Sequence, residues 1–427
     1  MTFKVLYIFP NVPLDANYSG AASRYLQNFL ALKDLGIELH VLRFYTKNHM
    51  RKVLDVERSS KTAQIAYNNA ASWSELELPI PLPYQHSNSI TKLDSFIKDI
   101  FRPIETEFPK YGILTQEIRS KQKRIQPNLL WAEHSFAATA VWRARSSLPW
   151  VYSHIDTQYL VRSIRNNRPS WYHSLFNLIN RSIETRVSRD ADFVITGSIT
   201  EKERLKNIGC RSISVIPMIN HNFARLDPNF SLSPDLKIIH LGSLETTANR
   251  SGLISYLSLA HQSALERLQA MSVEITLMII GDATHLKPPL SELLLQPCIV
   301  CTGYVANLST VLRPYDIAIF PYTQDSGYRT KLPLLMGYAQ VIVATRAAVA
   351  GSLLPGLEQV CVLLDRVEEF PAKIAWLAAH PEERKRLGLA GRAFAERHFS
   401  LEAVRPLYSN LMRQIEPIQP PRPRIRA

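Results

Sequence analysis

Two cations lie two residues apart at the start of a helical pattern in the second half of the chain. The stretch "DSGYRTKLPLLMGYAQVIVAT", Asp325 to Thr345, reads as a turn, then Arg329 and Lys331, an apolar helical run and a β-branched strand. A guanidinium and an ammonium before a helix add to the positive end of its dipole, where a diphosphate can bind. A solvated basic loop is the alternative, and the spacing alone does not choose between them.

Tight turns follow several apolar strands in the same half of the chain. Gly242, Gly281, Gly303 and Pro321 each close or follow such a strand, and turns of this kind bring backbone close to a ligand. Any one of them is explained by an ordinary turn. Four in order along one half favour a ligand-binding role more than any single turn does.

Gly20 lies in the loop after the first predicted strand and precedes a helical run in "YSGAASR". Backbone N–H groups at the start of a helix can hold a phosphate. The chain contains neither a G-x-G-x-x-G sequence nor a P-loop, which argues against a standard dinucleotide or ATP site.

Polar side chains end three short strands in the first half, "NLLWAEHS", "PWVYSHID" and "ADFVITGS". The carboxyl ends of parallel strands line the ligand crevice of an open sheet. His134, His154, Asp156 and Ser198 are therefore candidates by position. A core or surface histidine explains His134 equally well.

The cysteines indicate a reducing compartment and no metal. Four cysteines are too few for a disulfide framework. Cys298 and Cys301 form a C-x-x-C pair, but no second pair and no pair of histidines completes a zinc site.

The length of the chain predicts more than one domain. At 427 residues the chain exceeds the usual size of one core, so two domains are expected.

The charge of the chain indicates its class of partner. Its formal charge of +13 favours an anionic partner such as nucleic acid, a phosphorylated small molecule or an acidic membrane surface. Zinc-finger spacing and an RNA-binding aromatic cluster are both missing, so nucleic acid is not expected. No apolar run approaches the roughly 20 residues of a membrane span, and we expect a cytoplasmic protein.

Strand and helix patterns alternate along most of the chain. Phe3–Phe9, "RYLQNFLALKDLG" and "IELHVLRFY" form a strand, helix and strand unit, which predicts a parallel sheet. Thr46–Gln126 reads as polar and helical segments. A second α/β series follows a Pro-containing loop. The predicted organisation is a first domain at 1–222, a linker at 223–235, a second domain at 236–400, a helix at 401–415 and a flexible basic tail at 416–427.

The order of these segments resembles that of retaining glycosyltransferases of the GT-B fold, family 4, over nearly the whole chain. The resemblance is carried by "SGAASRYLQNFLALKDLGIELHVL", "RDADFVITGSITEKERL", "IIHLGSLETTANRSGL" and "GYRTKLPLLMGYAQVIVAT", in family order. It implies an α/β protein of two doubly wound, Rossmann-like domains facing across a cleft. It also implies a nucleotide-sugar donor, a glycan, lipid-linked or small-molecule acceptor, transfer with retention, and no metal or other cofactor.

The resemblance assigns roles to particular residues. Gly20 and Ala21, with Arg329 and Lys331, are expected to contact the donor diphosphate. His154 matches the strand-end histidine near the reacting sugar, with Asp156 as its partner. The rest of the donor pocket is expected to comprise Gly242, Ser243, Gly281, Tyr304, Asp325, Ser326, Gly327 and Leu334.

The chain departs from the family at one pair of positions. Two glutamates with seven residues between them are usual across this loop and helix, and here they are Ser326 and Leu334. A leucine cannot accept a hydrogen bond from a ribose hydroxyl, and an unpaired buried hydroxyl costs about 1–3 kcal/mol. Asp325 is one residue away from the first position. An active transferase with a rebuilt ribose contact, a catalytically degenerate GT-B domain acting as a binding or partner subunit, and other GT-B chemistry such as epimerisation all stay open.

A basic segment suggests contact with lipid. "YLVRSIRNNRPSWYHSLFNLINRSIETRVSR" carries six arginines against one glutamate and includes Trp171, Tyr172 and Phe176. An amphipathic helix of this kind can lie on an anionic membrane, here the inner face. A helix packed on the first sheet with its basic residues outward is the alternative.

Overall fold

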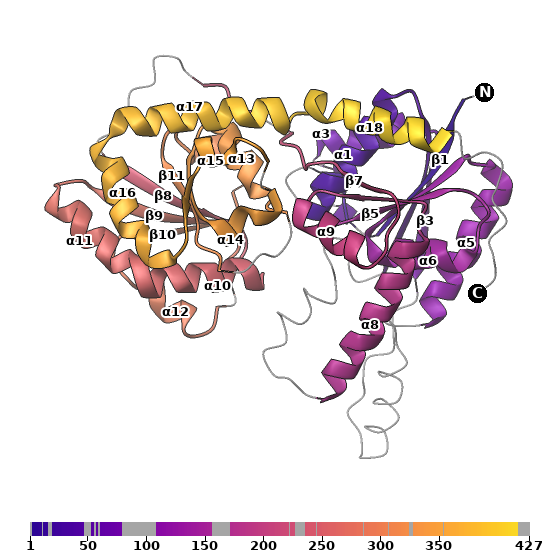
Figure 1. Ribbon diagram of the computed structural model, residues 1–427, viewed down its shortest axis with the longest axis horizontal. Coiled ribbons are helices and arrows are strands. Elements are labelled where there is room, and N and C mark those ends of the chain that lie inside the picture. The colour runs from indigo at the N-terminus through magenta and orange to yellow at the C-terminus, as the bar shows by residue number, and fades with distance from the viewer. Residues whose placement is uncertain are drawn as a thin grey trace. The chain divides into compact units, whose positions relative to one another are not determined.

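The computed structural model describes residues 2–10, 12–15, 19–46, 53–54, 57–58, 60–78, 108–155, 171–221, 223–226, 235–244, 246–284, 286–305, 307–323, 328–352 and 354–416. The chain divides into two compact units (Figure 1). Unit 1 comprises Met1–Ile216 with Arg405–Ala427, and unit 2 comprises Pro217–Val404.

Unit 1 contains a seven-stranded parallel sheet in the order β3-β2-β1-β4-β5-β6-β7. The chain runs outward from β1 to β3 and then returns to the other side of β1, as in doubly wound folds. The strands are β1 (Lys4–Pro10), β2 (Glu38–Thr46), β3 (Ser72–Leu78), β4 (Leu129–Glu133), β5 (Trp150–His154), β6 (Phe193–Thr196) and β7 (Ile213–Val215).

Helices cover both faces of this sheet because its central strands are apolar on both sides. Leu6 and Ile8 of β1 belong to a buried cluster with Leu114 of α5. Tyr7 of β1 points the other way, and its ring lies 6.0 Å from that of Phe29 in α1. The helices of this unit are α1 (Gly20–Asp34), α3 (Lys61–Asn69), α5 (Phe108–Ile125), α6 (His134–Ala144), α8 (Trp171–Asp190) and α9 (Ile199–Asn207).

The last helix, α18 (Leu401–Ile415), crosses the boundary between the units and is anchored to unit 1 by a buried polar network. The Tyr408 hydroxyl donates to Asn28 Oδ1. Asn28 Nδ2 donates to Glu133 Oε1 over 2.7 Å, and the Tyr7 hydroxyl donates to the same oxygen over 2.6 Å. Burial raises the pKa of the Glu133 carboxyl. These hydrogen bonds join two ends of the chain far apart in sequence.

Unit 2 contains a six-stranded parallel sheet in the order β10-β9-β8-β11-β12-β13. Its strands are β8 (Leu236–Leu241), β9 (Ile275–Ile280), β10 (Ile299–Gly303), β11 (Ile317–Phe320), β12 (Val341–Thr345) and β13 (Val362–Leu364). This order again reverses direction once, between β8 and β11.

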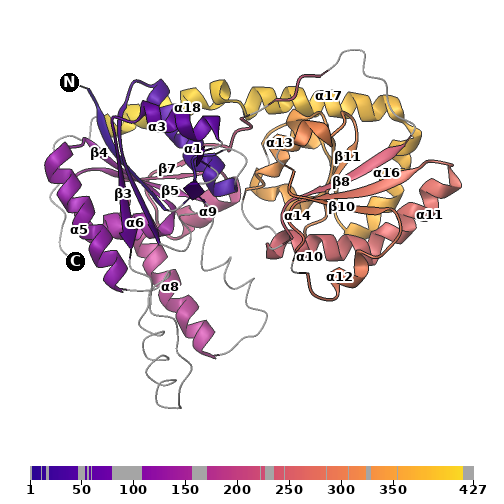
Figure 2. The ribbon, with the colours of Figure 1, turned by 180° about the vertical axis from the view of Figure 1, so that it is seen from behind.

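Alternate residues of these strands face two different helical layers. Ile238 of β8 lies in one buried cluster with side chains of α10, α11 and α16. Ile239, the next residue, lies in a second cluster with side chains of α13, α15 and α17. Figure 2 shows α10 and α12 below the sheet and α13 and α17 above it. The longer helices are α10 (Thr247–Tyr256), α11 (Gln262–Ala270), α13 (Lys331–Gly337), α16 (Phe370–Ala379) and α17 (Pro381–His398), and the shorter are α12 (Leu290–Leu293), α14 (Arg346–Val349) and α15 (Leu357–Val360).

The prediction of polar and helical segments across Thr46–Gln126 is wrong at β3. Its sequence, "SWSELEL", has little apolar character because β3 is an edge strand whose side chains, apart from Leu78, are partly or fully exposed. The fully buried Arg43 of β2 compensates for this polarity, since it forms ion pairs with both Glu75 of β3 and Glu57. A long-range ion pair of this kind leaves no periodic signal in the sequence.

The predicted domain boundaries remain predictions. Residues 227–234 of the predicted linker and 417–427 of the predicted tail lie outside the described residues. The contacts divide the chain after Ile216 and again within α18.

Candidate functional site

Strands β8 and β11 lie side by side at the centre of the sheet in unit 2, although other elements separate them in the chain. The chain leaves β8 toward β9 on one side and leaves β11 toward β12 on the other. Ligands of doubly wound folds bind where the order reverses in this way, at the carboxyl ends of the strands. The turn after β8 and the segment after β11 are therefore the expected binding edge.

The turn after β8 has no room for a side chain at Gly242. Its φ is +131°, and a Cβ built there would lie 1.8 Å from Lys331 Nζ and 2.7 Å from Asn249 Nδ2. Gly281, after β9, has a φ of +139°, and its Cβ would lie 2.4 Å from the backbone carbon of Gly242. Glycine at both positions lets the two turns and the ammonium pack together.

Lys331, the first residue of α13, is held beside this turn by Asn249 of α10. Its Nζ donates to Asn249 Oδ1 over 2.7 Å. Asn249 Nδ2 in turn donates to the carbonyl oxygen of Ser243 over 2.8 Å. One amide thus joins the turn after β8, helix α10 and the start of α13.

A second cation, Arg329, lies against the segment after β11. Its guanidinium carbon is 4.4 Å from the centre of the Tyr322 ring, a cation–π distance, and its Nε donates to the carbonyl oxygen of Ala348 over 3.1 Å. The Tyr322 hydroxyl donates to Asn249 Oδ1 over 3.3 Å. Together these residues form a cation cluster, which comprises Gly242, Ser243, Asn249, Tyr322, Arg329 and Lys331.

The electrostatics of the cation cluster favour the binding of an anion. Burial and the nearby Arg329 guanidinium lower the pKa of Lys331 from 10.5 to about 7. Burial and the charge of Lys331 lower the pKa of His240, at the end of β8, to about 3, so this imidazole is neutral. A bound anion would offset the repulsion between the two cations and favour the charged form of Lys331.

The structure brings together Gly242, Ser243, Gly281, Arg329 and Lys331 of the predicted site. Leu334 follows Lys331 by three residues on α13 and is half-buried, so both side chains share one helix face. Tyr304 follows the edge strand β10, is 70% exposed, and lies two strands away from β8. The predictions for Asp325, Ser326 and Gly327 fall outside the described residues.

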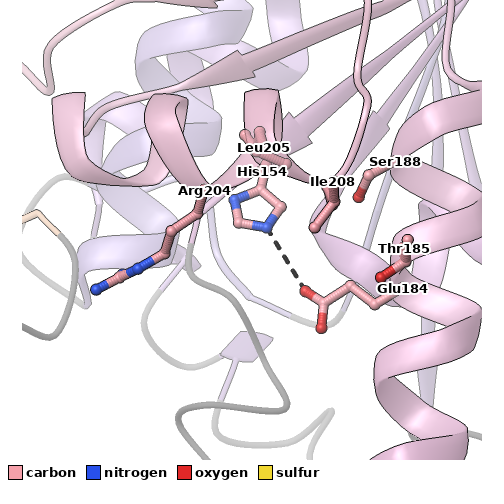
Figure 3. Close-up of a pocket in the computed structure, with 7 residues that line it drawn as sticks. All are labelled: His154, Glu184, Thr185, Ser188, Arg204, Leu205 and Ile208. Carbon is pink, nitrogen blue, oxygen red and sulfur yellow. Dashed lines mark ion pairs between the residues drawn. The ribbon is translucent and has the colours of Figure 1, made fainter.

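In unit 1, His154 ends β5 and is buried between two carboxylates. Its Nε2 lies 3.5 Å from Glu184 Oε1, and its Nδ1 lies 4.0 Å from Glu201 Oε2. Glu184 belongs to α8 and Glu201 to α9, and neither side chain is more than 3% exposed. Figure 3 shows the imidazole directed at Glu184. A small pocket here is lined by His154, Glu184, Thr185, Ser188, Arg204, Leu205 and Ile208.

The other predicted residues of unit 1 have separate positions. Gly20 and Ala21 form the first turn of α1, whose N-cap Ser19 accepts a hydrogen bond from the backbone N–H of Ala22 over 3.1 Å. His134 begins α6 in a left-handed conformation, with a φ of +69°. Ser198 is the N-cap of α9. Asp156 lies outside the described residues.

The described part of the chain contains neither a metal-binding cluster nor a membrane-spanning helix. Its residues bring together no group of three or more His, Cys, Asp or Glu side chains that could hold a metal ion. Cys298 and Cys301 are exposed free thiols at the edge strand β10. Among the helices that the structure describes, none has the length and apolar character needed to cross a membrane.

Comparison with known families identifies the part of the chain that holds the cation cluster. The family model described as glycosyl transferases group 1 matches residues 235–380. These residues form a group 1 glycosyltransferase domain. Every member of the cation cluster lies within this glycosyltransferase domain. A search of curated protein sequences found no match.

Solved glycosyltransferase-type structures share the fold of the whole chain. Sucrose-phosphate synthase from Thermosynechococcus elongatus is 14% identical, with a TM-score of 0.64 over 98% of this chain and 100% of that one. HepE from Anabaena, in complex with UDP and glucose, is 12% identical, with a TM-score of 0.62 over 96% and 99%. A TarM variant from S. aureus is 9% identical, with a TM-score of 0.62 over 96% and 99%. These likenesses confirm the predicted pair of Rossmann-like α/β domains of the GT-B type.

Several residues of these sites were not predicted from the sequence. In the glycosyltransferase domain, Asn249 follows the predicted strand at β8 and Tyr322 follows the one at β11. Neither an asparagine in a helix nor a buried tyrosine belongs to a recognisable sequence motif. Glu184 and Glu201 lie in helical patterns and read as ordinary surface charges. Their burial beside His154 follows from helix packing on the sheet.

Proposed function

We propose that the chain moves a sugar from a nucleotide diphosphate donor to an acceptor, with retention of the anomeric configuration. The observation that carries this proposal is the cation cluster at the β8/β11 edge of a group 1 glycosyltransferase domain. HepE, which shares the fold, is in complex with UDP and glucose, and this supports a nucleotide sugar as the class of donor.

The cations would act on the leaving group. In the transfer, the bond between the sugar carbon and the diphosphate oxygen breaks, and a bond to an acceptor oxygen forms on the same face of the sugar. The acceptor hydroxyl releases its proton to solvent water, and the diphosphate leaves with the electron pair of the broken bond and one more negative charge. Lys331 and Arg329 are proposed to stabilise that charge, and fixed charges of this kind usually supply a large part of catalysis.

The donor ribose is proposed to be recognised elsewhere than at α13. Leu334 presents a half-buried apolar side chain on the face of Lys331, where a hydrogen-bond acceptor is usual in the family that the sequence resembles. The same observation favours the second candidate function, a degenerate GT-B domain that serves as a binding or partner subunit. In the first case the diphosphate contact supplies most of the donor affinity.

A thermal-shift titration against UDP-, GDP-, ADP-, CMP- and dTDP-linked sugars tests the donor site, because a ligand that binds the native state raises the melting temperature. We expect a shift with sugars of one base that is lost in Lys331→Ala. Lys385→Ala, which removes an exposed lysine of α17, is the matched control and should retain the shift.

The outcomes separate the two candidate functions. A shift followed by release of nucleoside diphosphate in the presence of an acceptor supports the transferase. A shift without turnover supports a binding subunit. No shift with any of these donors, or a shift unchanged in Lys331→Ala, contradicts the assignment of the donor site.

His154 is proposed as the catalytic side chain of unit 1 near the reacting sugar, with Glu184 and Glu201 as the carboxylates around it. No metal is proposed to take part. Full activity after treatment with a strong chelator would agree with this, and activity restored only by added divalent cations would contradict it.

Peripheral contact with an anionic membrane at its cytoplasmic face is also proposed, from the arginine-rich sequence at and before α8. Such contact would place the protein near a glycan or lipid-linked acceptor. Flotation with vesicles of anionic and of neutral lipid tests it, and salt-sensitive binding to the anionic vesicles alone is expected. Equal recovery with both vesicle types would refute the idea.

A further inference from the structure

We infer that Asn249 is a positioning residue that holds the Lys331 ammonium beside the Gly242 turn, where the donor diphosphate would bind. The inference rests on the function proposed above. Its basis is the 2.7 Å hydrogen bond from Lys331 Nζ to Asn249 Oδ1, which joins residues 82 positions apart in the chain.

The orientation of the Asn249 amide is determined by its neighbours. Its Nδ2 faces the carbonyl oxygen of Ser243, which can only accept, and its Oδ1 faces the ammonium of Lys331, which can only donate. The Tyr322 hydroxyl donates to the same Oδ1. A flipped amide would place its NH₂ group against the ammonium, so one orientation is stable. At 8% exposure, the side chain has little access to water.

A lysine side chain needs such a partner to act as a fixed charge. It is a flexible four-carbon stem with a compact, strongly hydrated ammonium, and its rotamers must be restrained to keep the charge in one place. Asn249 restrains it at the carboxyl end of β8, beside a glycine turn that has no side chain to block an incoming anion. The ammonium therefore lies at the expected binding edge before any ligand arrives.

Because the Asn249 side chain is uncharged, it can orient the Lys331 ammonium without neutralising it. Among the described residues, Lys331 has no carboxylate within ion-pair distance, and its side-chain partner is an uncharged amide. An aspartate of the same shape would orient the ammonium but would also neutralise it and compete with a diphosphate. The amide orients the cation and leaves its charge available.

The charged neighbours of Lys331 favour loss of its proton in the absence of a ligand. Burial and the charge of Arg329, before α13, lower its pKa, and His240 of β8 is neutral and adds no negative charge. Replacing the amide by a carboxylate would reverse this balance, because an opposite charge at hydrogen-bond distance raises the pKa of a lysine by about 1–3 units.

The experiment compares Asn249→Ala and Asn249→Asp with the wild type, and uses Ser251→Ala, an exposed position on the same helix, as the matched control. Affinity for UDP and for inorganic pyrophosphate is measured by calorimetry. The reactivity of the Lys331 amine is measured against pH by acylation and peptide mass spectrometry. We expect Asn249→Ala to weaken binding about tenfold, as for one lost hydrogen bond to a charged group. Asn249→Asp should weaken binding at least as much and move the midpoint of Lys331 reactivity upward by at least one pH unit.

The acylation measurement needs no ligand, so it separates failure of the inference from failure of the proposed function. If the wild type binds neither UDP nor pyrophosphate, the proposed donor site is refuted. The pH midpoint of Lys331 acylation in Asn249→Asp still decides whether residue 249 contacts Lys331. Wild-type affinity and an unchanged midpoint in both variants would overturn the inference. A merely structural asparagine would lower the melting temperature without moving that midpoint, and the Asp variant preserves the side-chain shape if the Ala variant fails to fold.

Discussion

The ammonium of Lys331 occupies the space that a side chain at Gly242 would need, since a Cβ there would lie 1.8 Å from Nζ. The glycine turn after β8 and the first residue of α13 are thus parts of one arrangement. A glycine here serves two purposes, because its φ of +131° is also one that other residues rarely adopt.

Gly242→Ala is expected to displace Lys331 and to abolish the thermal shift with nucleotide sugars. The strained backbone conformation should also lower the free energy of unfolding by about 1–3 kcal/mol. Urea denaturation measures the second effect. Gly112→Ala is the control, because nothing lies within 4 Å of a Cβ at this position in α5, and it should stabilise the protein by about 0.5–1 kcal/mol. Equal behaviour of the two variants would contradict the prediction.

Donor affinity is expected to fall as the pH rises through about 7, where Lys331 loses its proton. The diphosphate of a nucleotide sugar carries an ester at both ends and does not titrate between about pH 6 and pH 8. A loss of affinity over this range therefore comes from a titrating group of the protein. Calorimetric measurement of donor affinity at about pH 6, 7 and 8 checks this prediction. The pH dependence should disappear in Lys331→Arg, whose guanidinium stays charged. Affinity that is constant with pH in the wild type would contradict the assignment.

The stability of the ligand-free protein should rise with pH over the range in which donor affinity falls. The pKa of Lys331 is about 7 in the folded chain and 10.5 as its ordinary value, so between these values the unfolded chain binds more protons. The free energy of unfolding therefore gains a contribution from Lys331 as the pH rises from about 7 toward 10.5. Urea titrations at several pH values should show this rise in the wild type and not in Lys331→Met.

His154→Gln is expected to lower kcat by about 10²–10⁴, the usual contribution of a positioned acid or base, and to leave the thermal shift with nucleotide sugars unchanged. His40→Gln is the control, because His40 of β2 contacts Ser72 and Glu38 and has no part in the proposed chemistry. A transferase that keeps wild-type kcat in His154→Gln would exclude this histidine from catalysis.

Tyr408→Phe is expected to loosen the attachment of α18 to unit 1. The variant removes the hydroxyl that donates to Asn28 Oδ1 and leaves a buried acceptor unsatisfied, at a cost of about 1–3 kcal/mol. Chemical denaturation measures the loss. Tyr304→Phe, at a side chain that is 70% exposed, should change stability by less than about 0.5 kcal/mol. Equal stability of the two variants would show that the hydroxyl contributes nothing.

Most strands could be predicted because their signal is local. The runs at β1, β9 and β12 are largely apolar on both faces, as buried parallel strands must be, and β8 and β9 each end directly before a glycine. β3 could not be predicted, because its polar side chains are compensated by Arg43 of another strand. Arg329 and Lys331 could be proposed as a pair since they are two residues apart.

The sequence by itself determined the alternation of strands and helices, the glycines at the strand ends and the two cations, because each depends on residues close together in the chain. Only the tertiary structure decided which side chains surround those cations. Asn249 meets Lys331 because β8 and β11 become neighbours in the sheet, and their pairing depends on the packing of the whole domain. His154 acquires Glu184 and Glu201 for the same reason, since two helices separated in sequence pack beside one strand.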